Sequence, residues 1–251
     1  MSPANEEKTR RAPTVWARIS EPVREPRQVL TRDRIVDSAI RLADREGLDA
    51  VSMRKLADEL ETSPMSLYRH VHGRDDLLEL MYDSVIAPDR DLRHSGDWRR
   101  DLHVVARNIR DVALAHPWAT RMMTSGRPAF GPNALLGLEW ALAAVAGLGL
   151  PIADMSRMVL TVIGVAQATA QTEVGEVDEQ QRTGLSEADW HESMAPYLNQ
   201  VLESGDYPQV ATMLAVSHEQ DPEAIFDTTL GIVLDGLEQY VDQRRAAAAG
   251  D

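Results

Sequence analysis

The sequence predicts an all-α protein, with helices from about residue 31 almost to the C-terminus. Apolar residues recur at the three- and four-residue spacing that is typical of helices. Strand patterns bounded by turn pairs are scarce, and aromatic residues make up only 5% of the 251 residues. We therefore expect a three-helix N-terminal domain over residues 31–76 and a larger helical domain over residues 77–251.

Residues 1–30 lack this periodicity and contain four prolines among arginines and glutamates. The composition predicts a flexible basic arm. A solvated tail and an arm that reaches DNA phosphates or a minor groove are equally good interpretations. The arginines concerned are Arg10, Arg11, Arg18, Arg24 and Arg27.

Four short helices follow, and their ends are recognisable in the sequence. Thr31 can cap the first helix, and Gly47 is placed to end it in the left-handed conformation. Ser63 and Pro64 suit the cap and the first position of the third helix. The expected ranges are Thr31–Glu46, Ser52–Leu60, Ser63 to just before Gly73, and Asp75–Ile86.

The remaining sequence predicts longer helices that alternate with shorter ones. A helix over residues 97–115 should stop at His116-Pro117, because proline cannot continue it. The polar, acidic segment Glu173–Gly184 is expected to be a loop. Long helices are expected over Asp97–Ala115, Pro132–Gly147, Ile152–Val174 and Asp221–Arg245, and shorter ones near 118–124, 186–203 and 208–217.

The net charge of −14 is distributed unevenly along the chain. Residues 1–82 hold 14 Lys and Arg against 15 Asp and Glu, whereas residues 83–251 hold 12 against 25. Phosphate would repel the acidic C-terminal part. Only the N-terminal part is therefore expected to approach a nucleic acid.

Composition argues against several classes of protein. No run of 18 apolar residues could span a membrane, and no apolar leader is present, so we expect a cytoplasmic protein. Cysteine is absent, which excludes disulfides and thiolate metal sites. The seven histidines are scattered, and no Gly-rich phosphate loop occurs. We therefore expect no enzyme, no catalytic residue, no metal and no cofactor.

Two short helices joined by a tight turn over residues 52–71 fit a helix-turn-helix. Ala57 supplies the small residue where the two helices cross, and Leu56, Leu60, Leu67 and Val71 can form a minimal core. This packing turns polar and aromatic side chains outward, where they can meet base edges and phosphates. On spacing alone, an ordinary helical hairpin with a polar face remains an alternative. The outward residues are Met65, Ser66, Tyr68, Arg69 and His70.

The strings VSMRKLADEL (51–60), SPMSLYRHV (63–71) and RDDLL (74–78) resemble the DNA-binding domain of tetracycline-repressor (TetR) family regulators. The resemblance runs without a gap from Ile35 to Met81. One departure is Glu61, which stands where the family often has glycine, so a left-handed turn there is strained.

The resemblance implies which side chains contact operator DNA. Tyr68, His70 and Arg74 suit phosphate contact, with Lys55 a weaker candidate. Met65, Ser66 and Arg69 are better candidates for reading bases. The full implied set is Arg54, Lys55, Pro64, Met65, Ser66, Tyr68, Arg69, His70 and Arg74.

The family resemblance also implies a homodimer, joined by a four-helix bundle of the last two long helices. Here those helices are 152–174 and 221–245. Small residues would permit their close approach, namely Gly164, Ala168, Ala170, Gly231 and Gly236. We call the second helix of the helix-turn-helix, which begins at Ser63, the recognition helix. A dimer places its two recognition helices about 34–36 Å apart, which matches successive major grooves of a palindromic operator.

The C-terminal domain of such a regulator would bind a small effector. Magnesium–tetracycline is disfavoured, because Met123 stands where the family has a metal-binding histidine and a thioether is a poor Mg²⁺ ligand. Arg90, Val105, Ile109 and Ala141 also replace groups of that site. We expect instead an apolar cavity with a few polar anchors. It would be lined by Ile109, Trp118, Met122, Met123, Phe130, Leu136, Trp140, Met158, Val162, Gln167 and Gln171.

The leading hypothesis is a repressor that leaves its operator when a largely apolar drug or natural product binds, and so controls efflux. The pieces His116-Pro-Trp118 and 126–133 resemble repressors of natural-product efflux pumps. Three alternatives stay open. They are an activator, a regulator of lipid metabolism with an acyl thioester effector, and a helical small-molecule-binding module that does not bind DNA.

Overall fold

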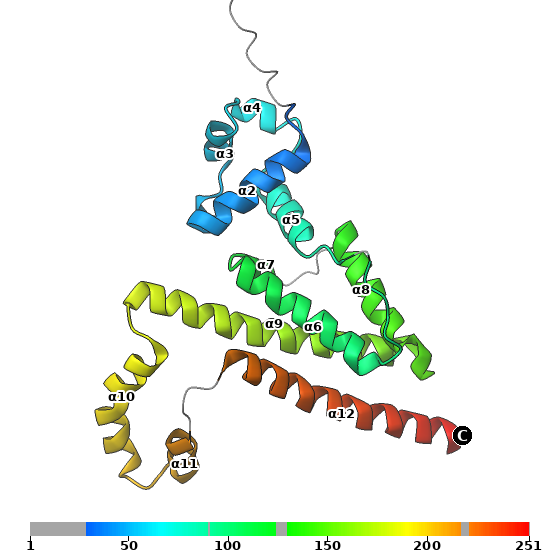
Figure 1. The fold of residues 1–251 in the computed structure, drawn as a ribbon, viewed down its shortest axis with the longest axis vertical. Helices are drawn as coiled ribbons and strands as arrows, with labels where there is room; N and C mark the ends of the chain where they lie inside the picture. Colours follow the sequence, from blue (N-terminus) through cyan, green and yellow to red (C-terminus); the bar gives the residue numbers. More distant parts are fainter. Residues whose placement is uncertain (1–28, 90, 124–129, 217–220, 251) are drawn as a thin grey trace, which may run out of the picture. The chain divides into compact units, whose positions relative to one another are not determined.

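The computed structural model describes residues 29–89, 91–123, 130–216 and 221–250. The described part is helical and contains no strand, which confirms the predicted all-α class (Figure 1). Its helices lie in one unit, Arg32–Asp251, and the predicted arm falls almost wholly outside the described residues. The proposed boundary between residues 76 and 77 lies inside one continuous helix, α5 (Arg74–Val85).

The N-terminal helices are α2 (Arg32–Glu46), the 3₁₀ turn η1 (Leu48–Ala50), α3 (Met53–Glu59), α4 (Pro64–Leu67) and α5. The Ser52 hydroxyl caps α3 by accepting from the Lys55 amide, and Ser63 caps α4 by accepting from the Ser66 amide. Glu61 has a φ of 49°, so this non-glycine residue does adopt the left-handed turn that its position requires.

A compact apolar core joins α2, α3, α4 and α5. Its central side chains are fully buried and come from every one of these helices. Leu56 and Leu67 hold α3 and α4 together as the helix-turn-helix pattern predicts. The fully buried residues here include Ile35, Leu42, Leu56, Ala57, Leu67, Leu77 and Met81.

The C-terminal helices are α6 (Trp98–Ala115), α7 (Ala119–Met123), α8 (Pro132–Val145), the 3₁₀ turn η2 (Ala146–Leu148), α9 (Ile152–Thr183), α10 (Glu187–Leu202), α11 (Pro208–Val216) and α12 (Pro222–Gly250). Their main core lies among α6, α8, α9 and α12. Arginines of α6 fasten α12 across this core, since Arg107 donates to Glu223 at 2.7 Å and to Asp227 at 2.9 Å.

The predicted loop at residues 173–184 was wrong, because α9 continues as a helix to Thr183. Two contacts hold the residues at which the predicted loop would begin. Arg110 of α6 forms a paired hydrogen bond with Glu173, with both N–O distances 2.8 Å, and Val174 packs against Ala113 and Ala170. Gly184, with a φ of 74°, then ends the helix. The rest of the extension, residues 175–183, is exposed, and the ion pair between Arg182 and Glu179 three residues earlier supports it locally.

Candidate functional site

The first candidate site is the outer surface of α3 and α4. Met65 is 70% exposed and Tyr68 is 46% exposed, although Leu67 between them is fully buried. Arg54, Pro64 and Arg69 are also exposed, and Ser66 and His70 are half-buried. Seven of the nine predicted DNA-contacting residues therefore lie around one exposed surface of α3, α4 and the turn that follows. The third helix is shorter than predicted, because α4 ends at Leu67 and residues 68–70 form a turn.

The other two predicted residues have partners within the protein. The Arg74 guanidinium donates from Nε to the Val51 carbonyl and from Nη2 to the Leu48 carbonyl, both at 3.0 Å. Lys55 Nζ forms an ion pair with Glu46. Arg74 thus fastens the start of α5 to the segment that enters α3, a structural task that the sequence pattern alone did not reveal.

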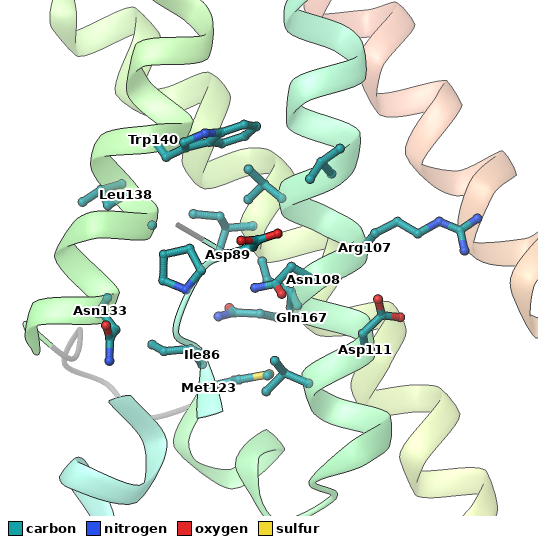
Figure 2. A pocket seen from close by; sticks show the side chains of 18 of the residues that line it. Ile86, Asp89, Arg107, Asn108, Asp111, Met123, Asn133, Leu138, Trp140 and Gln167 are labelled. Carbon is teal, nitrogen blue, oxygen red and sulfur yellow. The ribbon is translucent and has the colours of Figure 1, made fainter. Parts of the chain in front are cut away.

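The second candidate site is a cavity of about 770 Å³ inside the C-terminal domain. Figure 2 shows it between α6, α8 and α9, with the end of α5 at its lower edge. The volume suits a drug-sized ligand. The lining includes Tyr82, Ile86, Pro88, Asp89, Leu92, Asn108, Ile109, Met122, Met123, Asn133, Gly137, Leu138, Trp140, Leu160, Ile163 and Gln167.

Five of the eleven predicted effector residues line this cavity: Ile109, Met122, Met123, Trp140 and Gln167. The other six do not. Met158 and Val162 are fully buried in the helical core, where they face neighbouring helices. Phe130 and Leu136 are exposed, by 70% and 42%, and Gln171 is also exposed. Helical periodicity places such residues on a helix but does not say which neighbour each face meets.

Trp118 is the most instructive of these six residues. Its indole Nε1 donates to Asp44 Oδ1 of α2 at 2.7 Å, and His116 Nδ1 lies 2.8 Å from the same oxygen. Trp118 is 4% exposed. It therefore links α2 to the segment between α6 and α7 and does not line the cavity.

Several cavity residues were not anticipated from the sequence, and the polar Asn108 and Asp89 are among them. Asn108 and the anticipated Gln167 extend into the middle of the space (Figure 2). Within the described ranges neither amide forms a hydrogen bond to another residue. Trp140 lies at the α8 side, stacked on His94 with a ring-centroid distance of 4.4 Å, and its buried Nε1 has no hydrogen-bond partner in the described part of the chain.

Tyr82 of α5 is a further polar group at the cavity that the sequence did not single out. Its side chain lines the cavity and is only 9% exposed. Burial raises the pKa of the Tyr82 phenol above its ordinary value. The hydroxyl therefore stays protonated in neutral solution and can donate a hydrogen bond.

Among the residues that the structure describes, charged groups at the cavity wall carry an excess of negative charge. Arg107 is engaged by Glu223 and Asp227 of α12, and it also faces Asp111. His103 Nε2 lies 3.2 Å from Asp227. Since these basic groups are matched by carboxylates, Asp89 adds a further negative charge at the wall. The cavity is suited to a neutral or cationic molecule more than to an anion.

Helix α5 connects the two candidate sites. Arg74 at its first turn holds the helix-turn-helix, while Tyr82 and Ile86 near its last turn line the cavity. Asp83 binds the start of α8, because its Oδ1 accepts from the amides of Asn133 at 3.1 Å and Ala134 at 3.0 Å. The Asn133 side chain donates back to the Asp83 carbonyl at 3.0 Å. We call this group the α5–α8 latch.

Gly131 is required beside the latch. A Cβ at this position would overlap the Asp83 carboxyl group, so only glycine lets Asp83 approach the α8 N-terminus. Asp83 provides the side-chain cap that Gly131, the residue before α8, cannot supply.

The described residues contain neither a membrane-spanning helix nor a metal site. No helix there is long and apolar enough to span a membrane. No group of three or more His, Asp or Glu side chains in the same residues is arranged to hold a metal ion.

An exposed helix-turn-helix that one helix joins to an apolar cavity is the arrangement of a ligand-responsive DNA-binding regulator. This arrangement gives the class of the protein. Comparison with known families identifies the group. Residues 35–81 match the family described as bacterial regulatory proteins, tetR family, and residues 90–241 match the tetracyclin repressor-like C-terminal domain. The chain belongs to the TetR family of transcriptional regulators. Its members are regulators, so the protein is not an enzyme.

Individual relatives agree with this assignment. The chain is 36% identical over 237 residues to the HTH-type transcriptional repressor DrrR1 of Streptomyces coeruleorubidus, covering 94% of this chain and 87% of that protein. It is 37% identical over 199 residues to an HTH-type transcriptional regulator of Saccharopolyspora erythraea, covering 78% and 80%. The crystal structure of Streptomyces coelicolor ActR in complex with actinorhodin matches with a TM-score of 0.68 at 29% identity, covering 84% and 96%.

Proposed function

We propose that the protein is a ligand-responsive repressor whose unliganded dimer occupies a palindromic operator. A largely apolar effector enters the cavity among α6, α8 and α9 and favours a conformation that cannot hold the operator. The observation that carries this proposal is α5, since one helix both lines the cavity and is fastened to the helix-turn-helix by Arg74. An effector causes release only through a difference in affinity between the two conformations.

The nature of the cavity supports a drug-like or natural-product effector. Its wall is mainly apolar and includes Met122 and Met123, whose flexible thioethers adapt to varied shapes. ActR has been crystallised with actinorhodin, so a relative of this fold binds such a small molecule. An acyl thioester of coenzyme A carries several phosphates, and the carboxylates at this wall disfavour it. Control of efflux is the regulatory role that we propose for this effector.

Exposed small residues support a dimer through 152–174 and 221–245. Gly164 and Ala168 of α9 and Gly236 of α12 lie on exposed faces, whereas Ala170 is fully buried within the protomer. Ile232 of α12 is 69% exposed, an unusual exposure for a large apolar side chain in the middle of a long helix. These exposed faces suit packing against a second copy.

The α5–α8 latch supports a route for the signal. An effector that moves α8 pulls on Asp83, and because α5 is one helix the movement reaches Arg74 at its other end. A second connection between the domains passes through Asp44, which binds His116 and Trp118. The spacing of the two recognition helices in the dimer would then change.

The test is DNA binding to the intergenic region beside the protein's own gene, measured by gel shift over a range of salt concentrations. The wild type should bind tightly with a steep salt dependence, and Tyr68→Ala should bind at least tenfold more weakly. Tyr197→Ala on α10 serves as the control, because that exposed tyrosine lies far along the chain from the recognition surface. Equal binding by wild type and Tyr68→Ala would overturn the assigned surface. A thermal-shift screen of small molecules, followed by loss of the gel shift, then identifies the effector.

A further inference from the structure

Tyr82 carries a hydrogen-bond donor that has no protein partner among the described residues. Its side chain is only 9% exposed, and the residue lines the cavity. Its hydroxyl is not among the fully buried polar atoms that lack a partner, so it is open to the cavity, where water or a ligand can bind it. Because Tyr82 lines the cavity, an occupant of the cavity can supply the missing acceptor.

The surrounding groups limit what that occupant can be. Most of the cavity wall is apolar, with Ile86, Met123 and Ile163 among the lining side chains. The Asn108 and Gln167 amides reach into the same space from α6 and α9 (Figure 2). These amides can both donate and accept, whereas Tyr82 with its proton retained is the donor on α5. The excess of carboxylates at the wall disfavours an anion.

We infer that the effector is an uncharged or cationic, mainly apolar molecule whose hydrogen-bond-accepting oxygen, such as a ring carbonyl, is bound by the Tyr82 hydroxyl. This inference rests on the proposed function and names the ligand class for the same cavity. Asn108 and Gln167 bind a second polar group of the ligand. Tyr82 thereby determines specificity for an acceptor over a plain hydrocarbon.

The position of Tyr82 gives this contact a second consequence. Tyr82 precedes Asp83 of the α5–α8 latch, and Arg74 fastens the same helix to the helix-turn-helix. A ligand held by Tyr82 is therefore bound to the helix that carries the signal. A ligand that fills only the apolar space between α6, α8 and α9 contacts α5 through van der Waals packing alone.

The experiment uses two fluorescent probes and the full-length protein. Nile red is neutral, polycyclic and apolar and carries a ring carbonyl, whereas pyrene is a neutral polycyclic hydrocarbon without an acceptor. Both are titrated into the wild type, Tyr82→Phe and the control Tyr197→Phe. Tyr82→Phe keeps the ring and removes only the hydroxyl, so folding should be preserved, and circular dichroism checks it.

Tyr82→Phe should weaken Nile red binding about tenfold, the effect of one lost hydrogen bond, and should change pyrene binding less than about twofold. The comparison works as a double-mutant cycle in which the probe is the second partner. The emission maximum of bound Nile red should shift to shorter wavelength in Tyr82→Phe, because hydrogen bonding to its carbonyl moves emission to longer wavelength. Tyr197→Phe should match the wild type with both probes.

Failure of this inference is distinguishable from failure of the proposed function. Gly137→Phe blocks the cavity, because a Cβ at Gly137 meets no atom within 4 Å and the ring can enter the space. If Gly137→Phe abolishes binding of both probes but Tyr82→Phe binds Nile red as the wild type does, the cavity is a ligand site and the Tyr82 assignment is overturned. If neither probe binds the wild type, or if Gly137→Phe leaves binding unchanged, the ligand cavity itself is overturned, and the inference with it.

Discussion

The helix-turn-helix and the effector cavity are built in different ways. The DNA-reading surface comes from one short stretch, residues 51–71, in which caps, turn and core follow one another along the chain. The cavity collects side chains from five helices between Tyr82 and Gln167. The first site is a local motif with a fixed task. The second is a product of tertiary packing, so its lining can change while the fold is kept.

The largest expected effect tests whether the two regions are separable. Leu67→Ala removes a fully buried side chain from the helix-turn-helix core and should destabilise the protein by about 2–5 kcal/mol. Operator binding should be lost, measured by gel shift, while Nile red binding to the cavity is retained. Leu135→Ala on α8, where the side chain is 47% exposed, is the control and should cost less than about 0.5 kcal/mol. Loss of both activities in Leu67→Ala would mean that the two regions fold as one unit.

A smaller effect is expected at Arg74, where the family resemblance and the structure suggest different roles. Arg74→Met should lower the free energy of unfolding by about 1.5 kcal/mol, since the guanidinium binds the Val51 and Leu48 carbonyls. The slope of log affinity against log salt should stay the same. Arg69→Met is the matched comparison, because losing a phosphate or base contact from an exposed arginine should lower the slope by about one with little change in stability. If Arg74→Met lowers the slope of log affinity against log salt and leaves the free energy of unfolding unchanged, Arg74 contacts a DNA phosphate as the family resemblance implies.

Arg74 and Trp118 show which contacts could not be predicted from the sequence. Ser63, Pro64 and Glu61 were interpreted correctly, because caps and turns depend on neighbours within a few residues. The hydrogen-bond partner of Trp118 is Asp44, 74 positions away, and no periodic pattern in the sequence predicts a contact over that separation. A tryptophan near a predicted cavity therefore looks the same in the sequence whether it lines that cavity or joins two domains.

The error at the end of α9 has a different cause. Residues 175–183 are mostly polar and all exposed, so this part of the helix has no buried face that an apolar stripe could indicate. A solvated helix and a polar loop look alike in such a sequence, although its Glu, Gln and Arg residues favour the helix. Four of the five anticipated lining residues, Met123 and Trp140 among them, are apolar and came from helices with enough apolar residues for some to face the cavity, and Gln167 is the fifth. The polar lining residues that were missed, Tyr82, Asn108 and Asp89, gave no local signal.

The smallest expected change in stability, and the sharpest test of the link between the two regions, is at Asp83. Asp83→Ala removes the cap of α8 and should cost about 0.5–2 kcal/mol, while affinity for the operator without ligand stays within about twofold. Nile red affinity is then measured with and without operator DNA. For a probe that acts as an effector, operator should weaken its binding to the wild type by at least about fivefold, by the reciprocity of linked sites.

In Asp83→Ala that coupling factor should approach one, because α8 can then move without pulling α5. Asp111→Ala is the control, since this carboxylate also borders the cavity but lies on α6 and does not join α5 to α8. Gly131→Ala should resemble Asp83→Ala, because a Cβ there displaces the Asp83 carboxyl group from the α8 N-terminus. A coupling factor that is the same in wild type and Asp83→Ala would show that the signal bypasses the latch. The link through Asp44, His116 and Trp118 would then be the route to test, because it also joins the DNA-binding helices to the C-terminal domain.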